Sequence, residues 1–240
     1  MLDWLFSLDH RRRRLAARTA PGPLRDYLET PFVSRKTCCH TLDCLALDLE
    51  TTGPDAKEHA IVSFGWVLLY GNRIDLSSAQ HRLVRLQCAI PESSAVIHQI
   101  TDDNAACGEE LSSIMADLLQ LLAGKVLIAH HARVELAFID AACRQLYGGS
   151  FLAPVIDTQY IAQRQLERQK HFIRKGETRL ANLRKRYNLP RYTAHNALSD
   201  ALAAAELYLA QLAECSGNRP LPLEKMMWQP WKPCFAGGML

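Results

Sequence analysis

The sequence lacks the features that mark several large classes of protein. It has no hydrophobic run of transmembrane length and no internal repeat. Its eight cysteines include no CxxC pair and no Cys/His spacing typical of a zinc module. The short apolar stretch at the N-terminus precedes the arginines at 11–14, the reverse of the order in a signal peptide. We therefore expect reduced thiols, no membrane association and a cytoplasmic location.

Charge of one sign is also scarce. The 240 residues carry a formal net charge of only +3, which alone does not indicate a polyanionic partner. A hydrophobic fraction of 48% with 22% charged residues is typical of a globular chain and excludes a wholly disordered or coiled-coil one. This length accommodates one sizeable domain with short segments at its ends.

The pattern of apolar residues divides the chain into three parts. Residues 1–40 contain Pro-Gly-Pro at 21–23, no long apolar period, and eight Lys/Arg against four Asp/Glu, so we expect a basic N-terminal arm there. Residues 41–215 carry the regular apolar patterns and form the predicted folded domain. Residues 216–240 are rich in proline and tryptophan and are expected to form an extended tail.

The folded part begins with strands and continues with helices. Three strand-like runs start at Cys44, Ala60 and His81 and are typical of a meander. An amphipathic helix is predicted over 109–122. Short strands and helices then alternate, with strands at 126–129 and 154–156 and helices at 133–146, 158–168, 179–188 and 196–215. This order predicts an α/β domain with a mixed sheet.

Two acids stand on an otherwise apolar strand. In LALDLETTG, Asp48 and Glu50 are two residues apart, so both carboxylates point from the same face of the strand. Two like charges side by side on a buried strand repel each other and lose hydration, and a cation between them removes both costs. The alternative is a solvated strand end with two surface acids.

Further acids follow on separate elements. Glu135 lies just inside a helix after a buried strand, and Asp200 lies in the first turns of a helix that His195 precedes. Taken singly, each fits a plain role as a helix-start stabiliser or a surface acid. Four carboxylates and one His together match the requirements of two hard divalent cations, Mg²⁺ or Mn²⁺, that activate water for phosphodiester hydrolysis.

These motifs resemble those of the DEDDh 3′–5′ exonucleases, the family of the proofreading epsilon subunit of bacterial DNA polymerase III. The resemblance covers about residues 42–214. It includes Asp48-x-Glu50-Thr51-Thr52-Gly53, and His195 followed after four residues by Asp200. The segment IPESSAVIHQITDD, which contains His98, is similar to a family segment ending His-Gly-Ile-Thr, with Gln99 in place of Gly.

The second motif departs from the family pattern. The family has His-Asn and, three residues on, Asp, whereas this chain reads His130-His131-Ala132-Arg133-Val134-Glu135. Glu is one methylene longer than Asp and still reaches a cation if its helix sits slightly farther away. Asp157-Thr158 also fits the family, and we expect Asp157 to cap a helix rather than to bind metal.

The resemblance implies an RNase H-like fold, a mixed five-stranded sheet flanked by helices, with the exonuclease domain at 41–215. It implies a metal-dependent 3′–5′ exonuclease that acts on single-stranded DNA ends and releases nucleoside monophosphates. A 3′–5′ exoribonuclease and a catalytically idle nucleic-acid-binding module are the alternatives. The residue roles that the resemblance implies are Asp48 bridging two cations, Glu50, Glu135 and Asp200 completing the metal shell, His195 as general base, and Thr51, Thr52 and His98 contacting substrate.

A basic segment precedes the last motif. Residues 164–191 hold ten Lys/Arg against two Asp/Glu, which leaves the rest of the chain negative. We interpret Arg184, Lys185 and Arg186 as a track for the phosphate backbone of a single strand, DNA in preference to RNA. Solvated helix faces are the alternative. Four aromatic residues are interleaved with these basic residues, Tyr160, Phe172, Tyr187 and Tyr192. Base stacking and packing in the core are the two alternatives for them.

The two ends carry possible docking features. The arginines at 11–14 are compatible with a mobile basic arm or with a helix that docks a replication or repair protein. Trp228 and Trp231 either mark a docking peptide or pack back onto the domain.

Overall fold

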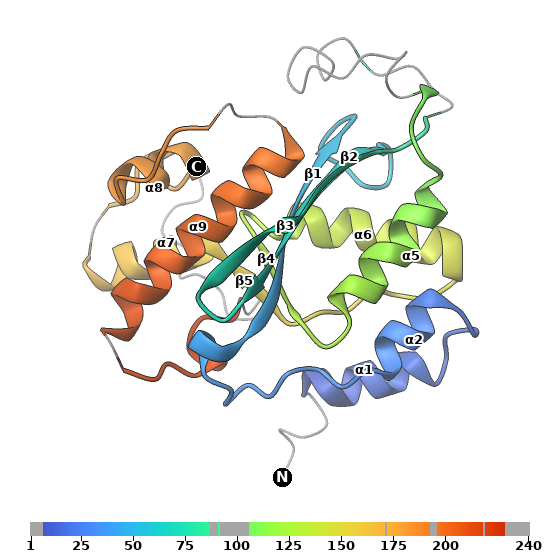
Figure 1. The fold of residues 1–240 in the computed structure, drawn as a ribbon, viewed down its shortest axis with the longest axis horizontal. Coiled ribbons are helices and arrows are strands. Elements are labelled where there is room, and N and C mark those ends of the chain that lie inside the picture. The colour runs from blue at the N-terminus through green and yellow to red at the C-terminus, as the bar shows by residue number, and fades with distance from the viewer. Residues whose placement is uncertain are drawn as a thin grey trace.

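A five-stranded sheet forms the centre of the computed structural model (Figure 1). The structure describes residues 7–86, 91, 106–170, 172–192, 196–217 and 219–228. The strand order is β3-β2-β1-β4-β5. The strands are β1 (Asp43–Thr51), β2 (Ile61–Tyr70), β3 (Arg73–Leu83), β4 (Val126–Ala129) and β5 (Val155–Asp157). The first three strands pair antiparallel and β1, β4 and β5 pair parallel, so the predicted mixed sheet is confirmed.

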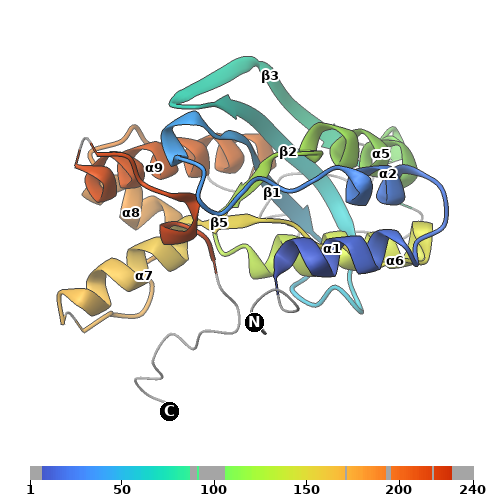
Figure 2. The same cartoon turned by 90° about the horizontal axis from the view of Figure 1, so that it is seen from below.

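Helices cover both faces of the sheet. Figures 1 and 2 show α7, α8 and α9 on one side and α1, α2, α5 and α6 on the other. The helices are α1 (Leu8–Ala16), α2 (Pro23–Glu29), α5 (Leu111–Leu122), α6 (Arg133–Tyr147), α7 (Thr158–Arg168), α8 (Leu180–Arg186) and α9 (Ala197–Ser216). No helix in the described part of the chain is long and apolar enough to cross a bilayer.

The alternation along β1 explains both cores. Leu45, Leu47 and Leu49 point into the cluster under α5 and α6. Cys44 and Ala46 point the other way, into the cluster under α9. Because side chains alternate with a period of two, Asp48 and Glu50 continue the face that α9 covers.

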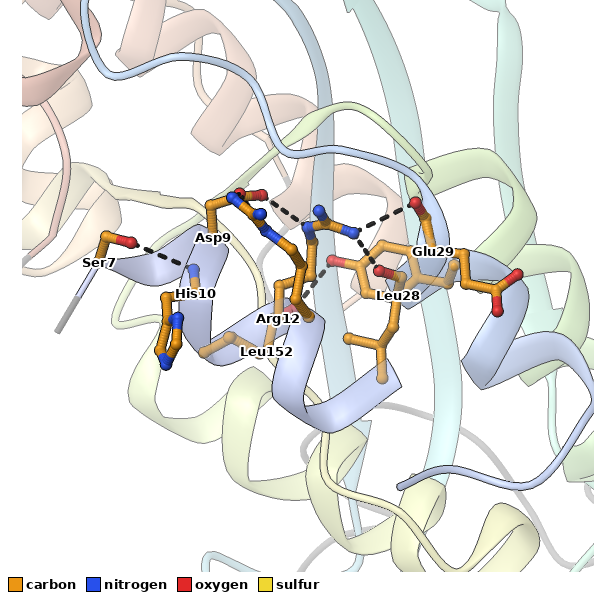
Figure 3. A network of polar contacts seen from close by, with 9 residues as sticks. Ser7, Asp9, His10, Arg12, Leu28, Glu29 and Leu152 are labelled. Carbon is orange, nitrogen blue, oxygen red and sulfur yellow. Dashed lines mark hydrogen bonds and ion pairs between the residues drawn. The ribbon is translucent and has the colours of Figure 1, made fainter. Parts of the chain in front are cut away.

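The N-terminal segment packs on the domain. Leu24, Tyr27 and Leu28 of α2 are buried in the main core. Figure 3 shows the Arg12 guanidinium donating to the carbonyl oxygens of Leu28 and Glu29, and it also pairs with Asp9. Residues 7–40 are therefore part of the packed domain rather than the basic arm expected from the sequence, because α2 supplies apolar side chains and Arg12 ties α1 to it.

The described part of the C-terminal segment also returns to the sheet. Pro222 forms a bridge with Cys38, and Leu223 and Met226 are buried. The Trp228 backbone N–H donates to the Val155 carbonyl at 2.8 Å, which places Trp228 along the β5 edge. Residues 219–228 therefore pack on the domain and do not form the extended tail that we expected. Trp231 lies outside the described residues.

Candidate active site

Three of the predicted metal ligands converge at one end of β1. Asp48, Glu50 and Asp200 each offer a carboxylate oxygen, and these oxygens lie within 4.8 Å of one another. Asp48 and Glu50 come from the end of β1, whereas Asp200 comes from the first turn of α9. The Asn196 side chain starts α9 by accepting from the Ser199 N–H at 3.1 Å. These acids come from two distant motifs that the sequence predicted to form one metal site, and metal binding by them stays a prediction.

A glycine brings α9 down onto the sheet. Gly65 of β2 pairs with Asp48 of β1, so the two residues lie side by side on the face that α9 covers. A Cβ at Gly65 would lie 2.0 Å from the Ala197 carbonyl carbon. Only a residue without a side chain allows this approach. Gly65 was not predicted as a site residue, although a glycine inside an apolar strand often marks a close backbone contact.

The carboxyl groups of this cluster repel one another when they are charged. Burial raises the pKa of Asp48 well above its usual value, and Glu135, Asp200 and Glu50 raise it further by charge repulsion. Burial, followed by repulsion from Asp200, raises the pKa of Glu50 to about 7. Carboxyl groups in this condition favour either a proton or a cation.

Glu135 stands next to this group on α6. Only 4% of the residue is exposed, and among the described residues neither its buried Oε2 nor the buried Oε1 of Glu50 has a hydrogen-bond partner. Burial raises the pKa of Glu135, and the charges of Asp157 and Glu50 add to the effect. Its charge in turn raises the pKa of Asp48, which puts the two in electrostatic contact. Glu135 is not one of the three acids whose oxygens lie within 4.8 Å of one another.

Asp157 holds the turn that positions Glu135. Its two oxygens accept the backbone N–H groups of His131 and Ala132, each at 3.1 Å. It also accepts from Gln159 at 2.9 Å and Tyr160 at 3.2 Å, which caps α7. His131 has a φ of 71°, an uncommon value for a residue with a side chain. Asp157 therefore fixes the start of α6 as well as capping α7, as predicted.

His130 is a structural neighbour in the same turn. Its Nδ1 lies 2.8 Å from the Thr158 hydroxyl. Burial, together with the nearby His131, lowers the pKa of His130 to about 4, so the ring is neutral near pH 7. A neutral imidazole adds no positive charge to the acidic cluster.

The donor set fits hard divalent cations. All the converging groups are carboxylates, the ligand type that Mg²⁺ and Mn²⁺ prefer. Glu50 and Glu135 each keep a buried oxygen for which the described residues supply no donor. Buried acceptors without partners are costly, and a cation satisfies them.

The predicted substrate-contacting threonines follow directly after the acids. The Thr51 hydroxyl donates to the Gly53 carbonyl at 2.8 Å. The Thr52 hydroxyl accepts the Ala60 N–H at 2.9 Å and closes the connection to β2. Both therefore shape the loop beside Glu50, and their contact with substrate stays a prediction. His195 and His98 lie outside the described residues, so their roles also stay predictions.

A basic cleft adjoins the acidic cluster. It has a volume of about 750 Å³, reaches Asp200 and is lined by Lys185, Arg179, Arg191 and Tyr192. Arg186, together with Lys185, lines a second cleft of about 420 Å³. Arg179 and Arg191 were not singled out from the sequence, because charge counts do not show which basic residues face a cleft.

Arg184 lines the same cleft as Asp200, but its guanidinium is held inside the protein. It is 4% exposed, and its guanidinium donates to the carbonyl oxygens of Pro190 and Ala203. It also pairs with Glu206 at 2.6 Å. The Arg184 donors are occupied inside the protein, so this residue ties α8 to α9 and we remove it from the proposed strand-binding set.

The four aromatics of the basic segment divide into different environments. Tyr160 is buried. The Tyr187 hydroxyl donates to Glu214. The Arg184 guanidinium lies over the Tyr192 ring, with its central carbon 4.6 Å from the ring centroid. Phe172 is 85% exposed in the connection between α7 and α8. Phe172 is thus the most exposed of the four, and Tyr192 is the one that borders the cleft with Asp200.

Comparisons with known proteins identify a family for this chain. The model of the RNase_T exonuclease family matches residues 45–208. DNA polymerase III subunit epsilon of Treponema pallidum is 29% identical over 168 residues, which cover 70% of this chain and 75% of that protein. The PolC-type DNA polymerase III of Thermotoga maritima is 25% identical over 165 residues, 69% of this chain but only 11% of that much longer protein.

Solved structures share the fold. The nuclease domain of 3′hExo, a DEDDh family member bound to rAMP, superposes with a TM-score of 0.62 at 15% identity, covering 74% of this chain and 95% of that domain. Exonuclease X in complex with 5′ overhanging duplex DNA gives 0.58 at 20% identity, covering 76% and 98%. The resemblance found in the sequence is confirmed: because the family model spans more than half of the chain, this protein belongs to the RNase_T exonuclease family.

Proposed function

We propose that the protein is a metal-dependent 3′–5′ exonuclease that acts on single-stranded DNA and releases nucleoside monophosphates. The observation that carries the proposal is the convergence of Asp48, Glu50 and Asp200 within 4.8 Å, with buried Glu135 beside them. Family membership supports phosphodiester hydrolysis. The 3′–5′ direction and the DNA substrate rest on the motif resemblance, and a relative named as a DNA polymerase subunit supports them.

The residues divide the work as follows. Asp48, Glu50, Glu135 and Asp200 would hold two Mg²⁺ or Mn²⁺ ions. When bound, such ions supply Lewis-acid stabilisation of the phosphoryl oxygens and lower the pKa of water. His195 takes the proton from the attacking water. Thr51, Thr52 and His98 contact the 3′-terminal nucleotide.

The adjoining cleft suits the approaching strand. Lys185, Arg179 and Arg191 line a surface that continues from Asp200, so positive charge flanks the acidic site. Phosphates attracted by this surface would lead the 3′ end toward the carboxylates. Tyr192 borders the same cleft and offers a ring for a base.

A replication protein is the partner class that the relatives' names support. Residues 7–40 and 219–228 pack on the domain, so such a partner would bind a folded surface rather than a free arm made of these residues.

The test is digestion of matched DNA and RNA 24-mers labelled at the 5′ end. We expect a ladder that shortens from the 3′ end with Mg²⁺ or Mn²⁺, faster for DNA, and no products in excess EDTA. A 3′-phosphorylated strand should resist. Asp200→Asn should be inactive, whereas the exposed surface variant Glu167→Gln should match wild type. Faster RNA digestion would favour the exoribonuclease, and full activity in EDTA would refute the metal mechanism.

A further inference from the structure

The arginines at 11–14 have two different fates. Arg12 is buried and donates to backbone carbonyls of α2, and Arg13 pairs with Asp9 at 2.8 Å. Both therefore stabilise the N-terminal helices. Arg11 and Arg14 are exposed, and within the described part of the chain neither has an ion pair or a side-chain hydrogen bond. A structural role thus explains two of the four arginines, Arg12 and Arg13, and leaves Arg11 and Arg14 unexplained.

The remaining arginines line one cleft. Arg11, Arg14 and Arg18 are spaced i, i+3 and i+7, so they lie on one face of α1 and its end over about 10 Å. Arg144 of α6 faces them across a cleft of about 420 Å³. Asp140 is the acid in the lining, and it already pairs with Arg144 at 2.7 Å. Three positive charges in the cleft are left without a counter-charge among its lining residues.

Such a cluster works against folding. Like charges three or four residues apart destabilise a helix, and neither Arg11 nor Arg14 has an ion pair or a side-chain hydrogen bond among the described residues in return. Charge-assisted, two-pronged hydrogen bonds to phosphate are the interaction for which guanidinium groups are best suited. The cleft therefore has the composition of a phosphate-binding site.

An apolar cavity next to the cleft narrows the choice of ligand. It has a volume of about 160 Å³, shares Arg11 and Phe151 with the cleft, and is lined further by Met227 and Trp228. An acidic peptide would need only the arginines. A nucleic-acid strand has phosphates and flat apolar bases side by side, which matches the charged cleft with an aromatic cavity beside it.

We propose that this α1–α6 cleft, lined by Arg11, Arg14, Arg18 and Arg144, binds the phosphate backbone of a single-stranded nucleic acid at a point remote from the acidic site. The proposal rests on the proposed function, because the occupant is a distal part of the same substrate strand. Arg144 follows Glu135 by nine residues on α6, which separates the cleft from the acidic site by about 14 Å along the helix axis alone. A trinucleotide held at the acidic site would not reach the cleft, whereas a 24-mer would.

The test compares two triple variants that each lose three positive charges. Arg11→Gln/Arg14→Gln/Arg18→Gln changes the cleft. The control, Arg25→Gln/Arg73→Gln/Arg219→Gln, changes arginines that line none of the described clefts. Arg73 and Arg219 are exposed, and Arg25 is half-buried and pairs with Glu29. Binding of a fluorescent DNA 24-mer is measured against salt in an Asp200→Asn background, which prevents digestion. Circular dichroism verifies folding.

We expect the cleft variant to lose about 2 units of salt slope, because each single-strand phosphate contact contributes about 0.7. The control should keep the wild-type slope. With Asp200 intact, kcat/KM for a trinucleotide should be equal in both variants and wild type.

Equal losses in both variants, or none in either, would overturn the proposal. So would an unchanged DNA slope combined with loss of poly-glutamate binding by the cleft variant, which would assign the cleft to acidic peptides. Because binding is read without turnover, failure here is distinguishable from failure of the proposed nuclease activity, which would appear as no digestion by wild type.

Discussion

Gly65 of β2 lies against the backbone of Ala197, so close that a Cβ at position 65 would fall 2.0 Å from the Ala197 carbonyl carbon. Gly65 pairs with Asp48, and Ala197 begins the helix whose first turn carries Asp200. This backbone contact therefore sets the separation between two acids, proposed as metal ligands, from distant parts of the chain.

Gly65→Ala should weaken metal binding and catalysis together. The added methyl group meets backbone atoms, which cannot move aside as a side chain can, so the start of α9 must shift away from β1. We expect destabilisation of roughly 1–3 kcal/mol and at least a tenfold loss in Mn²⁺ affinity, measured by thermal unfolding and calorimetric titration.

Gly217→Ala is the matched control at the other end of α9. Gly217 has a φ of 50° and nothing within 4 Å of its would-be Cβ, so the substitution costs only the left-handed strain of about 1–2 kcal/mol. It should lower stability without changing metal affinity. Equal metal affinity in Gly65→Ala and wild type would show that this contact does not set the Asp48–Asp200 separation.

The sequence predicted the elements better than it predicted close contacts. Asp48 and Glu50 were identifiable because charge on an apolar strand is unusual and the period of two puts both on one face. Gly65 was not identified and Arg184 was assigned to the substrate strand, since the roles of both depend on what another element brings against them. Arg12 shows the same limit: within four identical residues, only the packing of α2 distinguishes the buried guanidinium from its exposed neighbours.

Glu135 should behave as a metal ligand despite its extra methylene. Glu135→Ala removes a buried carboxylate with an unpartnered oxygen, and we expect activity to fall by more than ~10²-fold, since loss of an outer-shell partner already costs 10–100-fold. Glu135→Asp should retain only part of the activity, because its carboxylate falls one methylene short if α6 sits slightly farther from the site. Single-turnover digestion at saturating metal measures both.

Glu167→Gln controls for loss of a carboxylate, because Glu167 is exposed on α7. It should leave turnover unchanged. Wild-type turnover in Glu135→Ala, alongside an inactive Asp48→Ala, would show that Glu135 is not a metal ligand. It would also strengthen the alternative that the protein is a nucleic-acid-binding module.

The metal-free protein should lose stability as pH rises. The pKa of Glu50 is raised from 4.5 to about 7, and the pKa values of Asp48 and Glu135 are raised as well. Between pH 4.5 and about 7 the folded state therefore binds more protons than the unfolded state. The free energy of unfolding falls as pH rises through this range. Melting curves in EDTA should show this decline.

Mg²⁺ should counter the decline, because cations replace the protons that are lost. The difference in Tm between Mg²⁺ and EDTA should therefore widen from pH 5 to pH 8. Glu50→Gln should flatten the EDTA profile, since an amide does not titrate. A Tm in EDTA that rises over this range would contradict the predicted burial of uncompensated carboxyl groups.

Neighbouring basic residues on α8 should separate stability from strand binding. Arg184→Met removes the ion-pair partner of Glu206, which keeps its hydrogen bond from Tyr192, and removes the side-chain donor to the Pro190 and Ala203 carbonyl oxygens. Breaking such a buried pair costs about 3 kcal/mol, which corresponds to a fall in Tm of roughly 6–12 °C. Lys185→Met removes an exposed charge that lines the cleft with Asp200, so Tm should stay within about 1 °C. The salt dependence of its affinity for single-stranded DNA, measured as the slope of log affinity against log salt, should fall by about 0.7 in the Lys185→Met variant. If Arg184→Met melted like wild type but lost the salt slope instead, its guanidinium would contact the strand after all, and the original assignment of the whole basic run to the substrate would stand.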